Sequence, residues 1–224
     1  MIPWERLDAV MLEDGVELRL MRRGTEFSIM LGSNELMNSR LSGSEEALAN
    51  LAADKLPGRP GLRMLIGGLG MGFTLRAALK ALGDDARITV AELVPQVIAW
   101  AKGPMSPVFG DCLDDPRVAL AEAEVGDLIR NARDGWDAIV LDVDNGPDGL
   151  TRQGNDALYS AAGLGAAHRA LSAGGIFSVW SSAPDAAFTR RLKQAGFTVT
   201  EVPTRASTKK RGARHMIWLA VKQG

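Results

Sequence analysis

A glycine-rich run and a downstream acid have the types and spacing suited to binding a nucleoside. Gly67, Gly68, Gly70 and Gly72 directly follow an apolar segment. Glycine lets the backbone approach a ligand closely and adopt positive φ. Glu92 follows after about twenty residues, a separation at which a carboxylate meets ribose hydroxyls in Rossmann-like folds. We therefore predict that these four glycines and Glu92 bind an adenosyl nucleoside.

The glycine run is also compatible with a tight structural turn or with a dinucleotide site. The run alone is typical of such a turn, but the acid at the expected distance favours a ligand site. A dinucleotide fingerprint starting at Gly68 would need glycine where Phe73 stands. One starting at Gly70 would need glycine where Thr74 or Leu75 stands. The spacing thus disfavours NAD.

Asp142 and Asp144 follow a second apolar segment and are candidates for catalysis. Ligands of open α/β sheets bind at the carboxyl ends of the strands, so a carboxylate there can take a proton from a nucleophile. The alternative is that both residues cap the turn before Pro147, because aspartate readily bonds nearby backbone amides. Capping weighs more heavily for Asp144 than for Asp142.

Alternating short apolar runs and amphipathic segments surround these residues, which predicts a parallel sheet with helices on both faces. The expected strands are Arg63 to Ile66, Arg87 to Ala91, Arg117 to Ala121, Asp137 to Leu141, Gly175 to Trp180, Thr198 to Pro203 and His215 to Val221. The expected helices are Gly72 to Leu82, Pro95 to Lys102, Gly126 to Ala132, Ala157 to Leu171 and Asp185 to Ala195. Because no helix separates the last two strands, they should form an antiparallel hairpin at the edge.

The first residues predict a smaller N-terminal piece. Val16 to Met21 and Phe27 to Leu31 are typical of a short hairpin, and Ser44 to Leu56 is typical of a helix. We predict this piece over residues 1–57 and a Rossmann-like α/β domain over residues 58–224, with a seven-stranded, mostly parallel sheet.

Composition excludes several classes of function. Lys and Arg total 26 against 27 Asp and Glu, a net charge of −1, so nucleic acid is an unlikely partner. The single cysteine, Cys112, excludes an internal disulfide framework, and His168 and His215 make no recognisable metal-ligand set. The N-terminal residues contain no apolar run of the kind found in a signal peptide or a membrane span, so we expect a cytoplasmic protein. We also expect no bound metal.

Several stretches resemble the spermidine synthase family of aminopropyltransferases, from about Phe27 to the C-terminus. The matching stretches are Leu65 to Gly68, Val90 to Glu92, Asp115 to Val118, Leu141 to Pro147, Ala173 to Phe177 and Val202 to Thr204. The resemblance implies the class I adenosylmethionine-dependent fold and a cleft for a sulfonium nucleoside.

The resemblance also implies roles for single residues. Glu124, with Asp127 as a weaker alternative, falls where the family contacts adenine. Asp142 falls on the acid that helps to deprotonate the attacking amine. Glu46 falls on a family glutamate, and Glu46, Tyr159 and Arg205 are the candidates for contact with the acceptor.

The chain also departs from the family at two positions near the expected site. Gly70 replaces the aspartate that faces the amine of decarboxylated adenosylmethionine, and Ser44 stands where a tyrosine is usual. Arg205 begins a basic cluster that reaches His215, which is typical of a solvated hairpin loop and less often of a site for an anionic acceptor.

Three functions follow from these observations. We expect a transferase that uses S-adenosylmethionine or its decarboxylated form to alkylate a small acceptor, with Asp142 as proton acceptor. A methyltransferase is the alternative, because Gly70 leaves room for an intact methionine carboxylate. The third is a nucleoside- or partner-binding protein without catalysis. A homodimer is also expected, for which Phe27, Ile29 and Leu31 offer an apolar interface unless they cover the sheet.

Overall fold

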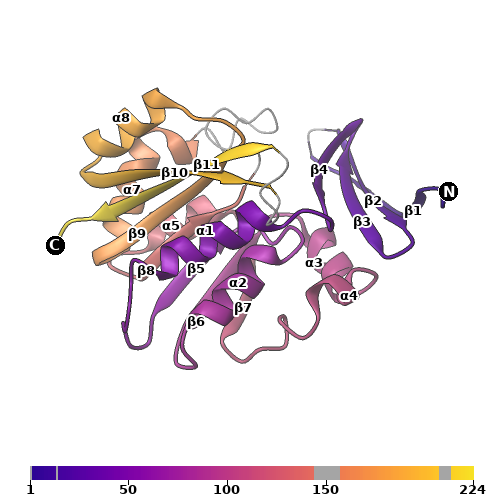
Figure 1. Ribbon diagram of the computed structural model, residues 1–224, viewed down its shortest axis with the longest axis horizontal. Coiled ribbons are helices and arrows are strands. Elements are labelled where there is room, and N and C mark those ends of the chain that lie inside the picture. The colour runs from indigo at the N-terminus through magenta and orange to yellow at the C-terminus, as the bar shows by residue number, and fades with distance from the viewer. Residues whose placement is uncertain (1, 14, 144–156, 207–212) are drawn as a thin grey trace.

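The N-terminal piece is a four-stranded antiparallel sheet in the order β1-β2-β3-β4. The computed structural model describes residues 2–13, 15–143, 157–206 and 213–224. The strands are β1 (Glu5–Met11), β2 (Glu17–Arg23), β3 (Glu26–Leu31) and β4 (Asn34–Asn38). Figure 1 shows this sheet at one end of the molecule, beside α3 and α4.

The predicted hairpin corresponds to β2 and β3, and two further strands extend it. β1 contains the charged residues Glu5, Arg6 and Asp8, and β4 is short and mostly polar. Neither has the alternation of apolar and polar residues from which a half-buried strand is predicted, because both lie at the sheet's edges.

The predicted interface residues of the hairpin face the interior. Phe27 and Ile29 are buried in the main hydrophobic cluster, and Leu31 packs against it. These three residues cover the core, which is the alternative that the sequence left open, and a homodimer stays a prediction.

The larger sheet has seven strands in the order β10-β11-β9-β8-β5-β6-β7. The strands are β5 (Arg63–Gly67), β6 (Arg87–Glu92), β7 (Val118–Glu122), β8 (Trp136–Leu141), β9 (Leu171–Ser181), β10 (Phe197–Arg205) and β11 (Arg214–Lys222). β5 to β9 pair in parallel, whereas β11 pairs antiparallel with both β9 and β10. The predicted sheet and its antiparallel terminal hairpin are confirmed.

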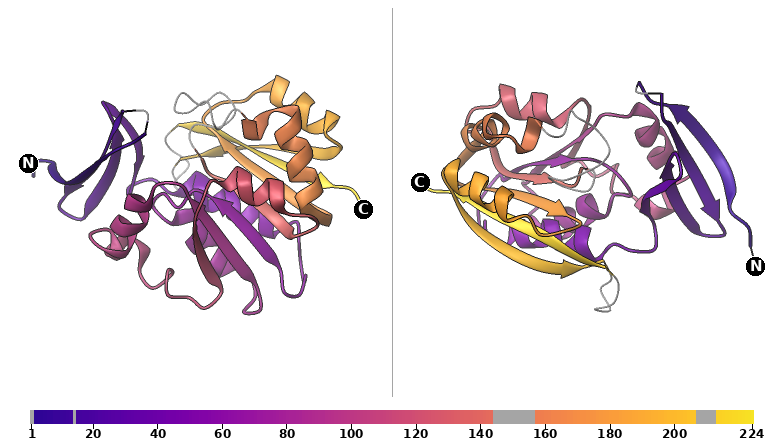
Figure 2. Two further views of the ribbon diagram at one scale, coloured as in Figure 1. Left: turned by 180° about the vertical axis from the view of Figure 1, so that it is seen from behind. Right: turned by 90° about the horizontal axis from the view of Figure 1, so that it is seen from above.

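Helices cover both faces of this sheet (Figures 1 and 2). They are α1 (Gly43–Ala53), α2 (Phe73–Ala81), α3 (Pro95–Lys102), α4 (Ser106–Phe109), α5 (Val125–Asn131), α7 (Ala161–Ala170) and α8 (Ala186–Gln194). Side chains alternate along β5, so that Met64 and Ile66 join the cluster under α1, α2 and α3, while Leu65 joins the one under α5, α7 and α8.

Most helices lie within a few residues of their predicted bounds, and the clearest differences concern α7 and α4. The segment predicted as one helix over residues 157–171 contains α7 only from Ala161. Ser160 caps α7 by accepting a hydrogen bond from the Gly163 N–H at 3.1 Å, and Leu171 already begins β9. The short helix α4 was not predicted, because four residues carry no helical periodicity.

The position of α1 bears on the division of the chain. α1 packs against α2 and the larger sheet, whereas the small sheet ends at Asn38. The boundary at residue 57 therefore stays a prediction.

Among the described helices, none has both the length and the apolar stretch that crossing a bilayer requires.

Candidate functional site

The glycine run forms a tight loop between β5 and α2. Gly68 has a φ of +90°, and a side chain there would place its Cβ 2.6 Å from the carbonyl oxygen of Asp142. Gly72 has a φ of +74° at the start of α2, and its Cβ would lie 2.4 Å from the ring of Phe109. Glycine is therefore required at both positions by conformation and by space.

Glu92 ends β6 with its carboxylate held by this loop. One carboxylate oxygen accepts a hydrogen bond from the Leu69 N–H at 3.0 Å, and the other accepts one from the Val94 N–H at 2.9 Å. The side chain is only 9% exposed, yet it lines a cavity. Carboxylate oxygens accept more than one hydrogen bond each, so this fixed group is also able to accept from ribose hydroxyls.

The first cavity lies between the two sheets. The loop and the carboxyl ends of the parallel strands contribute Gly68, Gly70, Ala91, Glu92, Glu124 and Asp142. The inner face of the small sheet and the turns beside it contribute Leu12, Leu18, Ile29, Leu31, Leu36 and Met37. The wall of the small sheet is therefore apolar, whereas the opposite wall sets acidic groups among apolar side chains such as Val94 and Val125, which suits a ligand with a flat base and a sugar.

Glu124 lies at the N-terminal end of α5 and lines the first cavity. It forms an ion pair with Arg130 at 3.1 Å. Asp127 pairs with the same arginine at 2.6 Å, but it is mostly exposed and lies outside the cavity lining. Of the two predicted adenine contacts, the structure favours Glu124.

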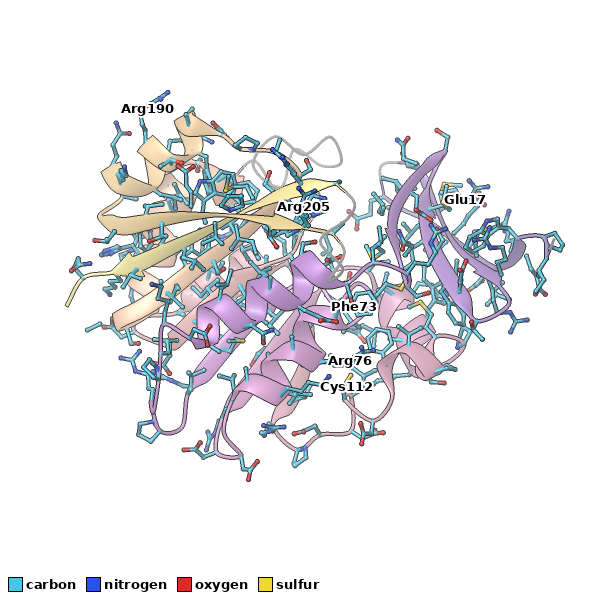
Figure 3. All side chains as sticks on the ribbon, viewed as in Figure 1. Glu17, Phe73, Arg76, Cys112, Arg190 and Arg205 are labelled. Carbon is cyan, nitrogen blue, oxygen red and sulfur yellow. The ribbon has the colours of Figure 1, made fainter. Side chains whose placement is uncertain are left out.

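A second cavity adjoins the first and shares with it Leu36, Met37, Gly70 and Asp142. It adds Asn38, Glu45, Leu69, Met71, Gly72, Phe73 and Trp180. Figure 3 shows Phe73 at the start of α2, on the side of the helix nearest the small sheet. Because Asp142 lines both cavities, its carboxylate stands at their junction.

Asp142 is partly buried and protonates more easily than an ordinary aspartate. The Thr74 hydroxyl donates a hydrogen bond to its carboxylate at 2.7 Å. Burial, followed by the negative charge of Glu45, raises the pKa of Asp142 from 3.8 to about 7. A carboxylate with a pKa near neutrality is suited to general-base catalysis.

Glu45 is a site residue that sequence reasoning missed. It precedes the predicted Glu46 in the first turn of α1, and it lines the second cavity whereas Glu46 does not. Burial raises the pKa of Glu45 as well. The only sequence signal was a pair of adjacent acids, which does not reveal which of the two faces the cleft.

The remaining predicted residues lie apart from the cavities. Tyr159 is buried in the hydrophobic cluster under α7 and α8, where its ring packs edge-on against Phe188 at 5.5 Å. Arg205 ends β10 opposite Arg214 and lines neither cavity (Figure 3). The placement of Tyr159 and Arg205 gives no support to substrate contact, and Asp144 lies outside the described residues.

The ionisable residues of both cavities are all acidic. Within the part of the chain that the structure describes, the lining contains Glu45, Glu92, Glu124 and Asp142 and neither lysine, arginine nor histidine. A lining with acidic and no basic side chains among the described residues favours cationic over anionic ligands. Among the same residues, histidine, cysteine and carboxylate side chains form no cluster of three that would hold a metal ion.

The architecture is that of the spermidine synthases. The crystal structure of a spermidine synthase in complex with the transition state analogue AdoDATO superposes with a TM-score of 0.76 and 19% identity over 97% of this chain and 72% of that one. Spermidine synthase from Thermotoga maritima gives a TM-score of 0.77 with the same identity and coverage. At this level of identity, the likeness shows the fold.

Curated proteins similar in sequence carry the corresponding name. Polyamine aminopropyltransferase 1 of Streptomyces coelicolor is 29% identical over 150 residues, covering 63% of this chain and 27% of that protein. Polyamine aminopropyltransferase of Mycobacterium tuberculosis is 32% identical over 154 residues, covering 63% and 28%.

The chain thus spans little more than a quarter of the length of these curated relatives. No protein-family model matches it. Together, the relatives and the solved structures confirm the resemblance to the spermidine synthase family.

Proposed function

We propose that the chain is an aminopropyltransferase that moves the aminopropyl group of decarboxylated S-adenosylmethionine to a small amine. Its fold and its similarity to polyamine aminopropyltransferases support the class of reaction. The fixed carboxylate of Glu92 is evidence for nucleoside binding, and the place of Asp142 at the junction of the cavities is evidence for its part in proton transfer.

The acidic lining of the cleft is the observation that carries this proposal. Decarboxylated S-adenosylmethionine has two positive charges, on the sulfonium and the amine. The intact donor also has a carboxylate, and the described lining offers it no positive side chain. Burying an anion beside acidic groups is costly, so the decarboxylated donor is the better match.

The space beside Gly70 also bears on the donor. A methyltransferase was favoured by the room that Gly70 leaves for a methionine carboxylate. A Cβ at Gly70 would lie 3.2 Å from the sulfur of Met37, which lines both cavities. Met37 thus occupies part of that room, which weakens the case for the methyltransferase alternative.

In the proposed reaction, the nitrogen of the acceptor attacks the methylene carbon bonded to sulfur. A carbon–nitrogen bond forms, the carbon–sulfur bond breaks, and its electron pair neutralises the sulfonium to a thioether. The ammonium form of the acceptor must first lose one proton, which Asp142 takes. The rate then depends on holding nitrogen and carbon in line, and the two adjoining cavities would do this.

The roles of the residues follow from their places in the cleft. Glu92 holds the ribose, Glu124 contacts the base, and Gly68 lets the backbone approach the nucleoside. Asp142 and Glu45 face the acceptor. A homodimer and a cytoplasmic location remain predictions.

Calorimetry tests the donor site directly. Decarboxylated S-adenosylmethionine, S-adenosylmethionine and methylthioadenosine would be titrated into the wild type and Glu92→Ala, with Asp127→Asn as a control outside the cavity. We expect micromolar binding of the decarboxylated donor, weaker binding of the intact one, and loss of both in Glu92→Ala. Preference for the intact donor would favour methyl transfer, and absence of binding would leave a fold without this activity.

Turnover tests the role of Asp142. The Asp142→Asn variant keeps the shape and the acceptor atom for the Thr74 hydroxyl but has no basic carboxylate. We expect aminopropyl transfer to fall by about 10²-fold or more, with donor affinity retained. Unchanged turnover would refute the assigned role, and binding without turnover by the wild type would favour a non-catalytic protein.

A further inference from the structure

A chain of hydrogen bonds leads from the second cavity to a histidine on the terminal hairpin. The Ser44 hydroxyl donates to the carboxylate of Glu45 at 2.6 Å, and His215 Nδ1 lies 2.9 Å from the same hydroxyl oxygen. The three side chains come from the first turn of α1 and the start of β11. Two elements far apart in the sequence thus build one continuous polar path.

The donor-to-acceptor direction of the hydrogen bonds along this path can reverse while the heavy atoms stay in place. With Glu45 ionised, Ser44 donates to the carboxylate and accepts from the Nδ1–H of His215. With Glu45 protonated, Glu45 donates to Ser44, and Ser44 donates to an unprotonated Nδ1. A hydroxyl that both donates and accepts can carry a proton in this manner.

The two ends of the path lie in different surroundings. Glu45 lines the second cavity with Asp142, and its charge acts on Asp142. Ser44 is fully buried, whereas His215 is only partly buried. The path therefore begins in the cleft and ends at a side chain with some access to solvent.

Among the residues that the structure describes, few charged groups lie beside His215. The ring of Trp180, from β9, lies edge-on to the imidazole with 4.7 Å between centroids. Thr204, from β10, is its strand partner, and Ser44 and Glu45 approach from α1. On the hairpin, Arg214 precedes it and pairs with Arg205. Glu45 is the acid to which the hydrogen bonds connect it.

We propose that Glu45, Ser44 and His215 form a proton relay that carries the proton released by the acceptor amine out of the cleft. Glu45 touches the acceptor and is the catalytic member, whereas Ser44 and His215 act through it. This inference rests on the proposed aminopropyl transfer.

The proton balance of the reaction requires such a path. An ammonium acceptor and a doubly charged donor give a protonated secondary amine, methylthioadenosine and one free proton. Asp142 takes that proton first, and the proton then passes to Glu45, which lines the same cavity, before it leaves the cleft. Glu45 passes a proton to Ser44 while Ser44 passes its own to His215, which releases it to solvent.

The protonation states fit this direction of transfer. Burial lowers the pKa of His215, so its imidazole is neutral at pH 7 and able to accept a proton. Ser44 stands where the resembling family has a tyrosine, and the small hydroxyl leaves room for the imidazole contact that the structure contains.

The hydrogen-bonded path can be tested without turnover. The chain has two histidines, His168 and His215, so a proton NMR titration gives two ring signals that His168→Gln assigns. We expect Glu45→Gln and Ser44→Ala to lower the pKa of His215 further and leave that of His168 unchanged, since a connected carboxylate stabilises the imidazolium. An unchanged pKa of His215 in both variants would overturn the path.

Kinetics then test the relay itself. Relative to wild type and the His168→Gln control, we expect Ser44→Ala and His215→Ala to lower kcat by roughly tenfold, with little change in KM for the donor. Added imidazole should restore part of the rate of His215→Ala. Equal kcat and pH profiles in all four proteins would refute the relay but leave the transferase intact. A wild type without aminopropyl transfer would refute both proposals.

Discussion

At the scale of the single residue, Asp142 is held in an environment that opposes its ionised form. Its pKa is about 7 in the folded chain against 3.8 ordinarily. Between these values the folded state binds more protons than the unfolded state, so the free energy of unfolding falls as the pH rises from about 4 to about 7. Ionisation of this side chain is thus destabilising, a cost that a functional group can carry.

The Asp142→Asn variant should therefore be more stable than the wild type at pH 8, by roughly 1–3 kcal/mol. At pH 5 the difference should be smaller, because the folded wild type keeps its carboxyl protonated and only the lower part of the pH range between the two pKa values has been crossed. Urea unfolding at both pH values measures this. The exposed Asp127→Asn serves as the control, and a stability difference for Asp142→Asn that does not depend on pH would contradict the raised pKa.

At the scale of the element, the loop between β5 and α2 depends on Gly72. A Cβ at this position meets the buried ring of Phe109, and the backbone is left-handed. We expect Gly72→Ala to lower the free energy of unfolding by roughly 2–4 kcal/mol, from backbone strain and overpacking together.

Gly174→Ala is the matched control for this prediction. Gly174 has a similar φ of +69°, but a Cβ there meets nothing within 4 Å. Substitution of Gly174 should lower the free energy of unfolding through backbone strain alone, by about 1 kcal/mol. Equal losses in the two variants, measured by denaturant unfolding, would show that the contact with Phe109 contributes nothing.

The elements that could be predicted from the sequence are those with a strong local pattern. The run from Met64 to Ile66 is apolar and ends in glycines, so a buried strand and a loop follow directly. β1 contains Glu5 and Asp8 on a half-exposed edge, and its pairing with β2 depends on contacts that are distant in sequence. Such edge strands have no local signature.

The candidate site was predictable to the same extent. Gly68, Glu92 and Asp142 follow apolar strands, and parallel strands bring their carboxyl ends together. Glu45 and His215 reach the site only because α1 and β11 pack beside each other. Tyr159 and Arg205 were selected by residue type, and the structure places both outside the cavities.

At the scale of the whole molecule, Asp8 adds polar contacts to the apolar packing that joins the small sheet to the rest. Its carboxylate accepts hydrogen bonds from the side chains of Trp100, at 2.7 Å, and Gln96, both on α3. The Trp100 side chain is buried. These hydrogen bonds hold the small sheet, which forms the apolar wall of the first cavity, against the wall that contributes the acidic groups.

We expect Asp8→Ala to loosen the small sheet, because it leaves the buried Trp100 N–H without its partner. Hydrogen exchange should rise in β1 and β2, and donor binding should weaken, while exchange in β5 and β8 stays unchanged. Arg22→Ala, which removes an exposed ion pair with Glu5 in the same sheet, is the control. Unchanged exchange in β1 would show that Asp8 does not help to attach the small sheet.

The sharing of the cleft between two sheets has an evolutionary consequence. The proposed nucleoside contacts come from the larger sheet, whose loop tolerates little change at Gly68 or Gly72. Leu31, Leu36 and Met37 come from the small sheet and are only partly buried, so substitutions there disturb the core less than substitutions at the fully buried Ile29. If the proposed activity holds, a lineage can thus change which molecules fit the cleft through substitutions in the first forty residues or so, while the loop that would hold the donor is inherited unchanged.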